Sequence, residues 1–226
     1  IKDNEYIEIP RRLKLNDKVI VDSKIYEKLT PQEIIAFSSQ VGASKIALEL
    51  GYDDLKSNYY NFGFTKPISI NFPSSSFGYM NIKERVSDKE LASLGYGYGL
   101  TISPFQIASA YSVFANNGIY KDFKLLLSEK VTTRRIISKH SADYVLKALE
   151  KVVKEGTGKA AEIRGFSEGG KTGTVHQIER GSGYLEDSYR ASFVGIAPLN
   201  DQSLTIFVSI DNPGLNAYSG GAVAAP

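Results

Sequence analysis

The stretch Glu168-Gly169-Gly170-Lys171-Thr172-Gly173-Thr174-Val175 predicts a strand that carries an anion-binding site. Threonine and valine here, followed by Ile178, favour a pleated strand. Gly173 leaves one position without a side chain, so that another backbone or a ligand can approach closely. The strand therefore offers an ammonium, two hydroxyls and backbone N–H groups, which together are suited to hold a carboxylate or an oxyanion.

Residues 165–172 also match the spacing of the phosphate-binding P-loop, G-x-x-x-x-G-K-[ST]. That motif requires an apolar strand before its first glycine and a helix that begins at its lysine. Here the five residues 160–164 include two charges, and strand-forming residues follow Lys171. Glu168 would also place a negative charge among phosphate-binding amides. The context therefore argues against a nucleotide site.

Lys171-Thr172-Gly173-Thr174 instead matches the K-T-G element of the serine enzymes that react with penicillin. Three residues alone describe an ordinary exposed strand start equally well. The interpretation therefore depends on whether companion motifs occur elsewhere in the chain.

Length and composition describe a globular chain that can bury a substantial core. The 226 residues are 42% hydrophobic and 23% charged, and 27 basic residues nearly balance 25 acidic ones. A net charge of +2 gives no electrostatic argument for nucleic-acid or membrane-surface binding. The chain has no cysteine, so disulfides and thiolate chemistry are excluded. No apolar run reaches the ~18 residues of a membrane-spanning helix.

Histidine chemistry has little support, because His140 and His176 are the only two histidines. A Ser-His-Asp triad or a histidine metal site is not expected from so few, and no cofactor is predicted. His140 opens an amphipathic stretch and is interpreted as a solvated residue, and His176 as a strand side chain. Any serine activation would need a lysine whose pKa is lowered by burial or by neighbouring cations.

Helix signals recur along the first two thirds of the chain. Thr30-Pro31-Gln32-Glu33 is a capping box, and the apolar pattern that follows it ends at Gly51, with a turn near residues 38–40, which predicts two helices. Ser103-Pro104-Phe105-Gln106 is a second capping box, and apolar residues from 142 to 153 predict a third amphipathic segment. Residues 1–29 are expected to form weak strands and turns, and residues 57–80 to form loops.

The last third of the chain predicts strands. A strand from Lys171 is expected to be followed by a loop at 179–188, a strand at 191–197 and a strand at 204–210, where apolar and polar residues alternate. Successive strands with short links imply an antiparallel sheet covered by the preceding helices. The predicted fold class is therefore α/β of the α+β kind. Gly95-Tyr96-Gly97-Tyr98-Gly99 is interpreted as a site of tight backbone packing.

In combination, these segments resemble class B penicillin-binding proteins of the cell-division type, the D,D-transpeptidases that cross-link septal peptidoglycan. Besides the Lys-Thr-Gly element, Ser38-Ser39-Gln40 stands where that family has a Ser-x-Asn motif between helices. The other matching stretches follow in the family's order from about residue 30 to the end: 95–106, 114–118, 193–198 and 218–226. The resemblance implies a penicillin-binding transpeptidase or β-lactamase-like fold, of which residues 1–226 would be the C-terminal part of one domain.

Two departures from the family pattern matter. No serine in the chain has a lysine three residues later, so the family's Ser-x-x-Lys nucleophile motif is absent from these residues. The isolated chain is therefore expected to be inactive. Gln40 also replaces the usual asparagine; it keeps the amide but adds a methylene, which changes fitted binding by about 1–3 kcal/mol.

The resemblance implies a role for each matched residue. Ser38 would relay a proton, Lys171 would orient Ser38 and supply positive potential, and Gln40 would hold the donor peptide. Thr172 and Thr174 would receive the substrate carboxylate, the Thr174 N–H would form half of the oxyanion hole, and Gly173 would let the substrate lie alongside the strand.

The resemblance further implies the D-Ala-D-Ala stem peptide and β-lactams as ligands and membrane proteins of the division machinery as partners. It places the enzyme at the periplasmic face of the bacterial cytoplasmic membrane. A β-lactamase, a D,D-carboxypeptidase or a β-lactam sensor of the same superfamily remains an alternative, as does a non-catalytic scaffold or partner-binding domain suggested by Gln40.

Overall fold

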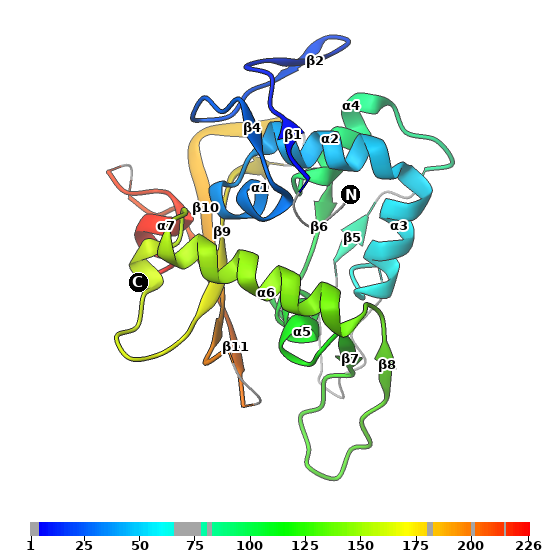
Figure 1. Cartoon of the computed structure of the whole chain (residues 1–226), viewed down its shortest axis with the longest axis vertical. Coiled ribbons are helices and arrows are strands. Elements are labelled where there is room, and N and C mark those ends of the chain that lie inside the picture. Colours follow the sequence, from blue (N-terminus) through cyan, green and yellow to red (C-terminus); the bar gives the residue numbers. More distant parts are fainter. Residues whose placement is uncertain (1–4, 66–77, 81–82, 180–182, 200–201, 215) are drawn as a thin grey trace.

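A three-stranded sheet forms the centre of the molecule. The computed structural model describes residues 5–65, 78–80, 83–179, 183–199, 202–214 and 216–226. Strands β9 (Gly169–Glu179), β10 (Gly183–Ala197) and β11 (Leu204–Asp211) lie in the spatial order β11-β10-β9, and both pairs are antiparallel. Helix α6 (Lys139–Lys154) crosses in front of these strands, and α7 (Gly220–Val223) packs against β9 and β10 (Figure 1). The predicted antiparallel sheet covered by helices is confirmed.

The two faces of this sheet have different surroundings, because side chains alternate along each strand. Phe193 of β10 is buried against Val153 of α6 and against the C-terminal Ala224 and Ala225. Thr172 is the register partner of Phe193, so Thr172 and Thr174 belong to this helix-covered face. Lys171 and Gly173 belong to the opposite face. The site-bearing strand thus presents its lysine and its threonines on different sides.

The predicted helical pair is present. Helix α1 (Pro31–Phe37) begins at the Thr30 capping box, in which Thr30 accepts from the Glu33 amide and the Glu33 carboxylate accepts from Thr30. Helix α2 (Gln40–Leu50) begins at Ser39, whose hydroxyl accepts from the Gly42 amide. Two residues, Ser38 and Ser39, therefore join the two helices. The second predicted capping box, at Ser103, begins α5 (Pro104–Ala115).

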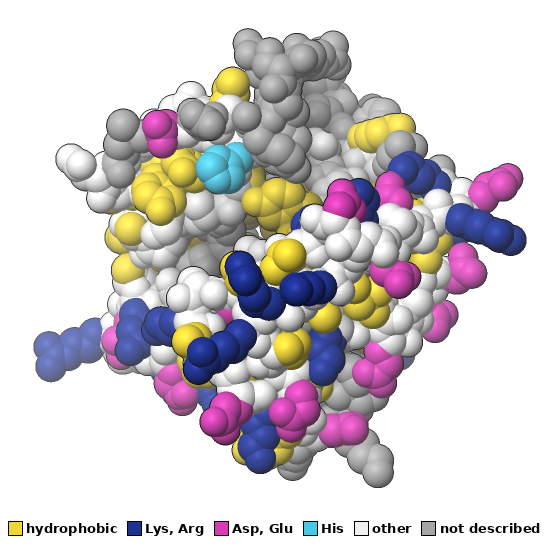
Figure 2. Space-filling model, turned by 90° about the horizontal axis from the view of Figure 1, so that it is seen from above, with side chains coloured by type: hydrophobic (Ala, Val, Ile, Leu, Met, Phe, Trp, Pro, Cys, Tyr) yellow, Lys and Arg dark blue, Asp and Glu magenta, His cyan; other side chains and the backbone are white. Residues whose placement is uncertain are grey.

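The N-terminal residues form short strands, as predicted for the described part of residues 1–29. β1 (Ile7–Glu8) pairs with β4 (Lys28–Leu29), and β2 (Leu13–Leu15) forms a hairpin with β3 (Lys18–Ile20). They pack on a core of buried residues that joins this segment to the helical pair: Ile9, Ile20, Leu29, Ile34, Val41 and Ala92. Seen from above, basic and acidic side chains are interspersed on the surface, which agrees with a net charge of +2 (Figure 2).

Short paired strands complete the fold. β5 (Tyr79–Met80) pairs with β6 (Leu100–Thr101), and β7 (Ile119–Lys121) pairs with β8 (Thr133–Arg135). A 3-10 turn, η1 (Lys159–Ala161), follows α6. Within the described ranges, no helix has the length and apolar character that a bilayer crossing requires.

Two sequence predictions were wrong. Residues 57–61, expected in a loop, belong to helix α3 (Tyr52–Asn61), whose first turn carries Asp53 and Asp54, where acidic side chains favour the helix dipole. Residues 66–77 of the same predicted loop lie outside the described residues, and Tyr79 and Met80 at its end form strand β5 instead. Strand β10 begins at Gly183, well before the expected 191, because Gly183 and Tyr184 already pair with the end of β9; the register then shifts before pairing resumes at Tyr189.

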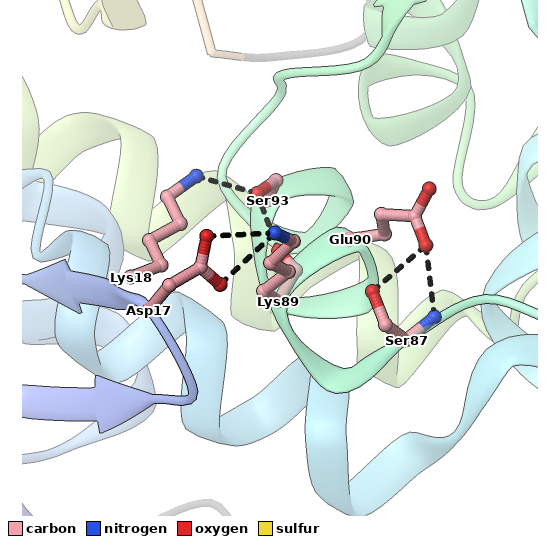
Figure 3. Close-up of polar contacts among 6 residues, drawn as sticks. All are labelled: Asp17, Lys18, Ser87, Lys89, Glu90 and Ser93. Carbon is pink, nitrogen blue, oxygen red and sulfur yellow. Dashed lines mark hydrogen bonds and ion pairs between the residues drawn. The ribbon is translucent and has the colours of Figure 1, made fainter.

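Helix α4 (Asp88–Gly95) lies between the β2–β3 hairpin and α2. Lys89 Nζ donates to both Asp17 carboxylate oxygens at 3.0 Å, and Lys18 Nζ donates to Ser93 Oγ at 2.7 Å (Figure 3). On its other side, α4 approaches α2 so closely that a Cβ atom on Gly95 would lie 2.5 Å from the Ala47 Cβ and 2.9 Å from the Ala43 carbonyl oxygen. The tight packing predicted for residues 95–99 is confirmed at Gly95 only: nothing lies within 4 Å of a Cβ on Gly97, and Gly97 and Gly99 take positive φ values of 92° and 88° instead.

Gly95→Ala should therefore lower the free energy of unfolding by about 1–3 kcal/mol, because the new methyl group overpacks the α2–α4 contact. The helix preference for alanine, about 1 kcal/mol, offsets only part of this cost because the clash involves backbone. Urea unfolding measures the change. Gly214→Ala is the control, since nothing lies within 4 Å of its added Cβ. Equal stability of the two variants would contradict the packing argument.

Candidate active site

The centre of the candidate site is a contact between two residues that are 133 positions apart. Lys171 Nζ on β9 donates to the Ser38 hydroxyl and, at 3.1 Å, to the Thr172 carbonyl oxygen. Ser38 ends α1 in the left-handed conformation, with φ 57° and ψ 42°, and its N–H donates to the Ile34 and Ile35 carbonyls. Its hydroxyl is exposed and faces the strand that carries the Lys-Thr-Gly element. The structure thus joins the two predicted motifs at one place.

Asp22 holds the turn that carries Ser38, although it belongs to none of the sequence motifs. One oxygen of the Asp22 carboxylate accepts from the Ser39 hydroxyl at 2.6 Å, and the other accepts from the Val41 amide at 3.1 Å. Ser39 itself is 2% exposed. The carboxylate therefore fixes the start of α2 and, through the chain, the adjacent Ser38. Charge-assisted hydrogen bonds of this kind are stronger than neutral ones.

Electrostatics at Lys171 favour proton exchange near neutral pH. Burial lowers the pKa of Lys171 from the ordinary value of 10.5 to about 8. Loss of hydration disfavours the ammonium, and its Ser38 partner is neutral and gives no compensating charge. The group is mostly protonated at pH 7 and can change its protonation state within about one pH unit of that value.

The two predicted carboxylate-binding hydroxyls already have one protein partner each. Thr174 Oγ1 accepts from the Gly220 amide at 2.9 Å, and Thr172 Oγ1 lies 2.7 Å from Thr157 Oγ1. A hydroxyl that accepts one hydrogen bond still has its own proton to donate. Both threonines therefore remain able to bind an anion at the edge of β9.

Gly173 and Gln40 have surroundings that the sequence did not predict in detail. A Cβ on Gly173 would lie 2.5 Å from Ser192 Oγ, so the space beside this glycine is taken by a hydroxyl of the neighbouring strand. Gln40 lies in the first turn of α2 with an exposed side chain, and its carbonyl accepts from Ser44 Oγ at 2.7 Å. Gln40 is thus exposed to solvent two residues after Ser38.

A groove of about 660 Å³ lies beside the distal part of β9, and its lining residues do not include the predicted site residues Ser38, Gln40 and 171–174. Its walls come from the glycine- and tyrosine-rich segment 95–102, from the start of α5 and from all three central strands, with Val175, Gln177, Ser192 and Phe207 among the lining residues. His176 also borders it, with its ring 4.5 Å from that of Tyr189. Among the described residues, no three His, Asp or Glu side chains are grouped to hold a metal ion.

Asp22→Ala should lower the free energy of unfolding by about 1–3 kcal/mol, because it leaves the buried Ser39 hydroxyl without its acceptor. Glu49→Ala removes an exposed acid from the same helical pair and should change stability by less than about 0.5 kcal/mol. Thermal or urea unfolding of the two variants provides the measurement. If Asp22→Ala proved as stable as Glu49→Ala, the carboxylate would not hold the turn.

The low pKa of Lys171 predicts that stability rises with pH between about 8 and 10. In that range the unfolded chain keeps the lysine proton that the folded protein has lost, so the free energy of unfolding should increase by about 1–2 kcal/mol. Above pH 10 the trend reverses, because burial raises the pKa of Tyr59 and of Tyr111 to about 12. Chemical unfolding at several pH values tests this, and Lys171→Met should remove the rise. A rise that persists in the variant would assign it to another group.

Comparison with known proteins places these motifs in a family. The family model of the penicillin-binding protein transpeptidase domain matches residues 1–226. Peptidoglycan D,D-transpeptidase FtsI of Buchnera aphidicola is 34% identical over 209 residues, which are 92% of this chain and 37% of that protein. FtsI of Escherichia coli is 31% identical over 229 residues, with 100% of this chain and 38% of that protein covered. The chain thus spans less than two fifths of the length of these relatives.

Comparison with solved structures points to the same family. The apo transpeptidase domain of Burkholderia pseudomallei penicillin-binding protein 3 matches with a TM-score of 0.91 and 32% identity, over 100% of this chain and 70% of that one. Penicillin-binding protein 3 of Mycobacterium tuberculosis in complex with ampicillin matches with a TM-score of 0.83 and 25% identity, over 93% of this chain and 51% of that one. By fold, motif order and sequence, this chain belongs to the penicillin-binding protein transpeptidase domain family.

Proposed function

We propose that the full-length protein containing this chain is a peptidoglycan D,D-transpeptidase that forms an acyl-enzyme on a serine. The observation that carries the proposal is the hydrogen bond from Lys171 to Ser38, which brings the Lys-Thr-Gly element and the Ser-Ser-Gln turn to one place. The names of the relatives support the same activity. Residues 1–226 would be the C-terminal part of a single transpeptidase domain.

The reaction would be acyl transfer. A serine outside this sequence attacks the carbonyl carbon of the D-Ala-D-Ala amide, an ester forms, and the bond to the terminal D-Ala nitrogen breaks. The departing nitrogen needs a proton, and Ser38 would relay it. Lys171 would orient the Ser38 hydroxyl and, as an ammonium, stabilise negative charge in the site. An amine from a neighbouring strand then takes the acyl group and releases the serine.

Strand β9 would bind the substrate. The Thr172 and Thr174 hydroxyls are expected to donate to the terminal carboxylate, and the Thr174 N–H to contribute one of the two oxyanion-hole donors, whose loss typically costs about 2.7–4 kcal/mol. The Gln40 amide would contact the donor peptide. β-Lactams would acylate the same serine, and the ampicillin complex of the Mycobacterium tuberculosis relative supports this ligand class.

The proposed substrate determines the proposed location. Stem peptides occur in the bacterial cell wall, so we place the active domain at the periplasmic face of the cytoplasmic membrane. Membrane proteins of the division machinery are the proposed partners, since two of the relatives are FtsI enzymes.

Labelling with a fluorescent penicillin tests the function. The full-length protein should form a stable covalent adduct, whereas residues 1–226 alone should form none, because the Ser-x-x-Lys motif is absent from them. Lys171→Ala should slow acylation of the full-length protein by about 100-fold or more through lost electrostatic stabilisation. Lys147→Ala, which removes an exposed lysine of α6, is the matched control.

Equal labelling of the two lysine variants would refute the role of Lys171. A covalent band on residues 1–226 alone would refute the expected inactivity of the isolated chain. Rapid hydrolysis of the penicillin by the full-length protein would identify a β-lactamase instead of a transpeptidase.

A further inference from the structure

The segment after α6 packs tightly against the helix that ends at Ser38. A Cβ atom on Gly156 would lie 2.2 Å from the Ala36 carbonyl oxygen, and the Thr157 amide donates to the same oxygen at 3.4 Å. The Gly158 amide donates to the Val152 carbonyl at 3.0 Å and thereby ties the segment to the end of α6. Thr157 is thus held next to Ala36, two residues before Ser38.

Thr157 contacts two further elements of the site. Its hydroxyl lies 2.7 Å from that of Thr172 on β9. Its carbonyl oxygen would lie 2.3 Å from a Cβ atom on Gly221, so α7 can pack here only with a glycine at that position. The residue therefore stands where α1, β9 and α7 meet. None of the family motifs in the sequence includes it.

We propose that Thr157 is a positioning residue that directs the Thr172 hydroxyl toward a bound carboxylate. The hydroxyl of Thr157 donates to Thr172 Oγ1, and Thr172 then donates its own proton to the anion. The chain of two hydrogen bonds is polarised by the negative charge, which strengthens both. This inference rests on the proposed function and extends it to a residue outside the Lys-Thr-Gly element.

The neighbouring threonine supports the same arrangement. Thr174 Oγ1 accepts from the Gly220 amide at 2.9 Å, which leaves the Thr174 proton to be donated outward. Both hydroxyls of the strand thus have a protein hydrogen-bond partner, and in the proposed arrangement both accept from it. A hydroxyl that already accepts a hydrogen bond is restricted in orientation, so it loses less rotational entropy when it binds the anion.

Removing the Thr157 hydroxyl distinguishes its proposed positioning role from a contribution to packing alone. Thr157 is exposed, so Thr157→Val keeps its shape and deletes the hydrogen bond at little cost in buried surface. Thr157→Ser keeps the hydroxyl. Thr133→Val, on the exposed strand β8, is the control for the same substitution far from the site.

The experiment compares benzylpenicillin with its methyl ester, which lacks the negative charge. Acylation rate constants are measured for the full-length protein by competition with a fluorescent penicillin. Thr157→Val should reduce the rate constant for benzylpenicillin by about tenfold, as expected for a weakened hydrogen bond to a charged group, and should leave that for the ester nearly unchanged. Thr157→Ser and Thr133→Val should behave as the wild type.

The ratio of the two rate constants is taken within each variant, so a partly unfolded preparation does not change it. A wild-type ratio in Thr157→Val would overturn the inference, and so would an equal loss for both compounds, which would indicate a structural role only. Failure of Thr157→Ser to restore the ratio would also contradict it. If the wild-type protein did not react with benzylpenicillin at all, the proposed function itself would be refuted, and this inference with it.

Discussion

The hydrogen bond between Lys171 and Ser38 is the constraint on which the site depends, because it requires two distant segments to fold to one position. Its lysine stands on a sheet strand and its serine at the end of a helix, so neither element can form the site alone. Burial of the lysine without a charged partner lowers its pKa to about 8. The same arrangement therefore supplies both the geometry and the electrostatics of the proposed proton relay.

Small residues and short polar contacts hold these two elements in place. Asp22 fixes the turn after Ser38 through Ser39 and Val41. On the other side, the Gly156–Thr157 segment packs on the end of α1 and reaches β9 through the two threonine hydroxyls. Because Gly95 has no side chain, α4 can pack closely against α2. Asp22 and Thr157 lie outside the recognised motifs, and their contacts hold the two ends of the Ser38 turn.

Local patterns predicted much of this fold, and tertiary contacts account for what they missed. The capping boxes at Thr30 and Ser103 and the strand at Lys171 have short sequence signatures, and the placement of Ser38 beside Lys171 followed from the resemblance. Asp22 lies 17 residues before Ser39 and in no motif, so its hydrogen bond forms only once tertiary folding brings the two residues together. Helix α3 was missed because aromatic and polar residues hide its periodicity.

The opposite orientation of Lys171 and Thr172 on β9 has a consequence for how the strand must pair. A slip of β9 by one residue against β10 would exchange the sheet faces on which the ammonium and the hydroxyl lie. Glycines oppose this error: a Cβ on Gly170 would lie 2.3 Å from the Phe193 ring, and one on Gly173 would lie 2.5 Å from Ser192 Oγ. The glycines of β9 thus favour one strand register, and that register determines which chemical group faces which side of the ligand.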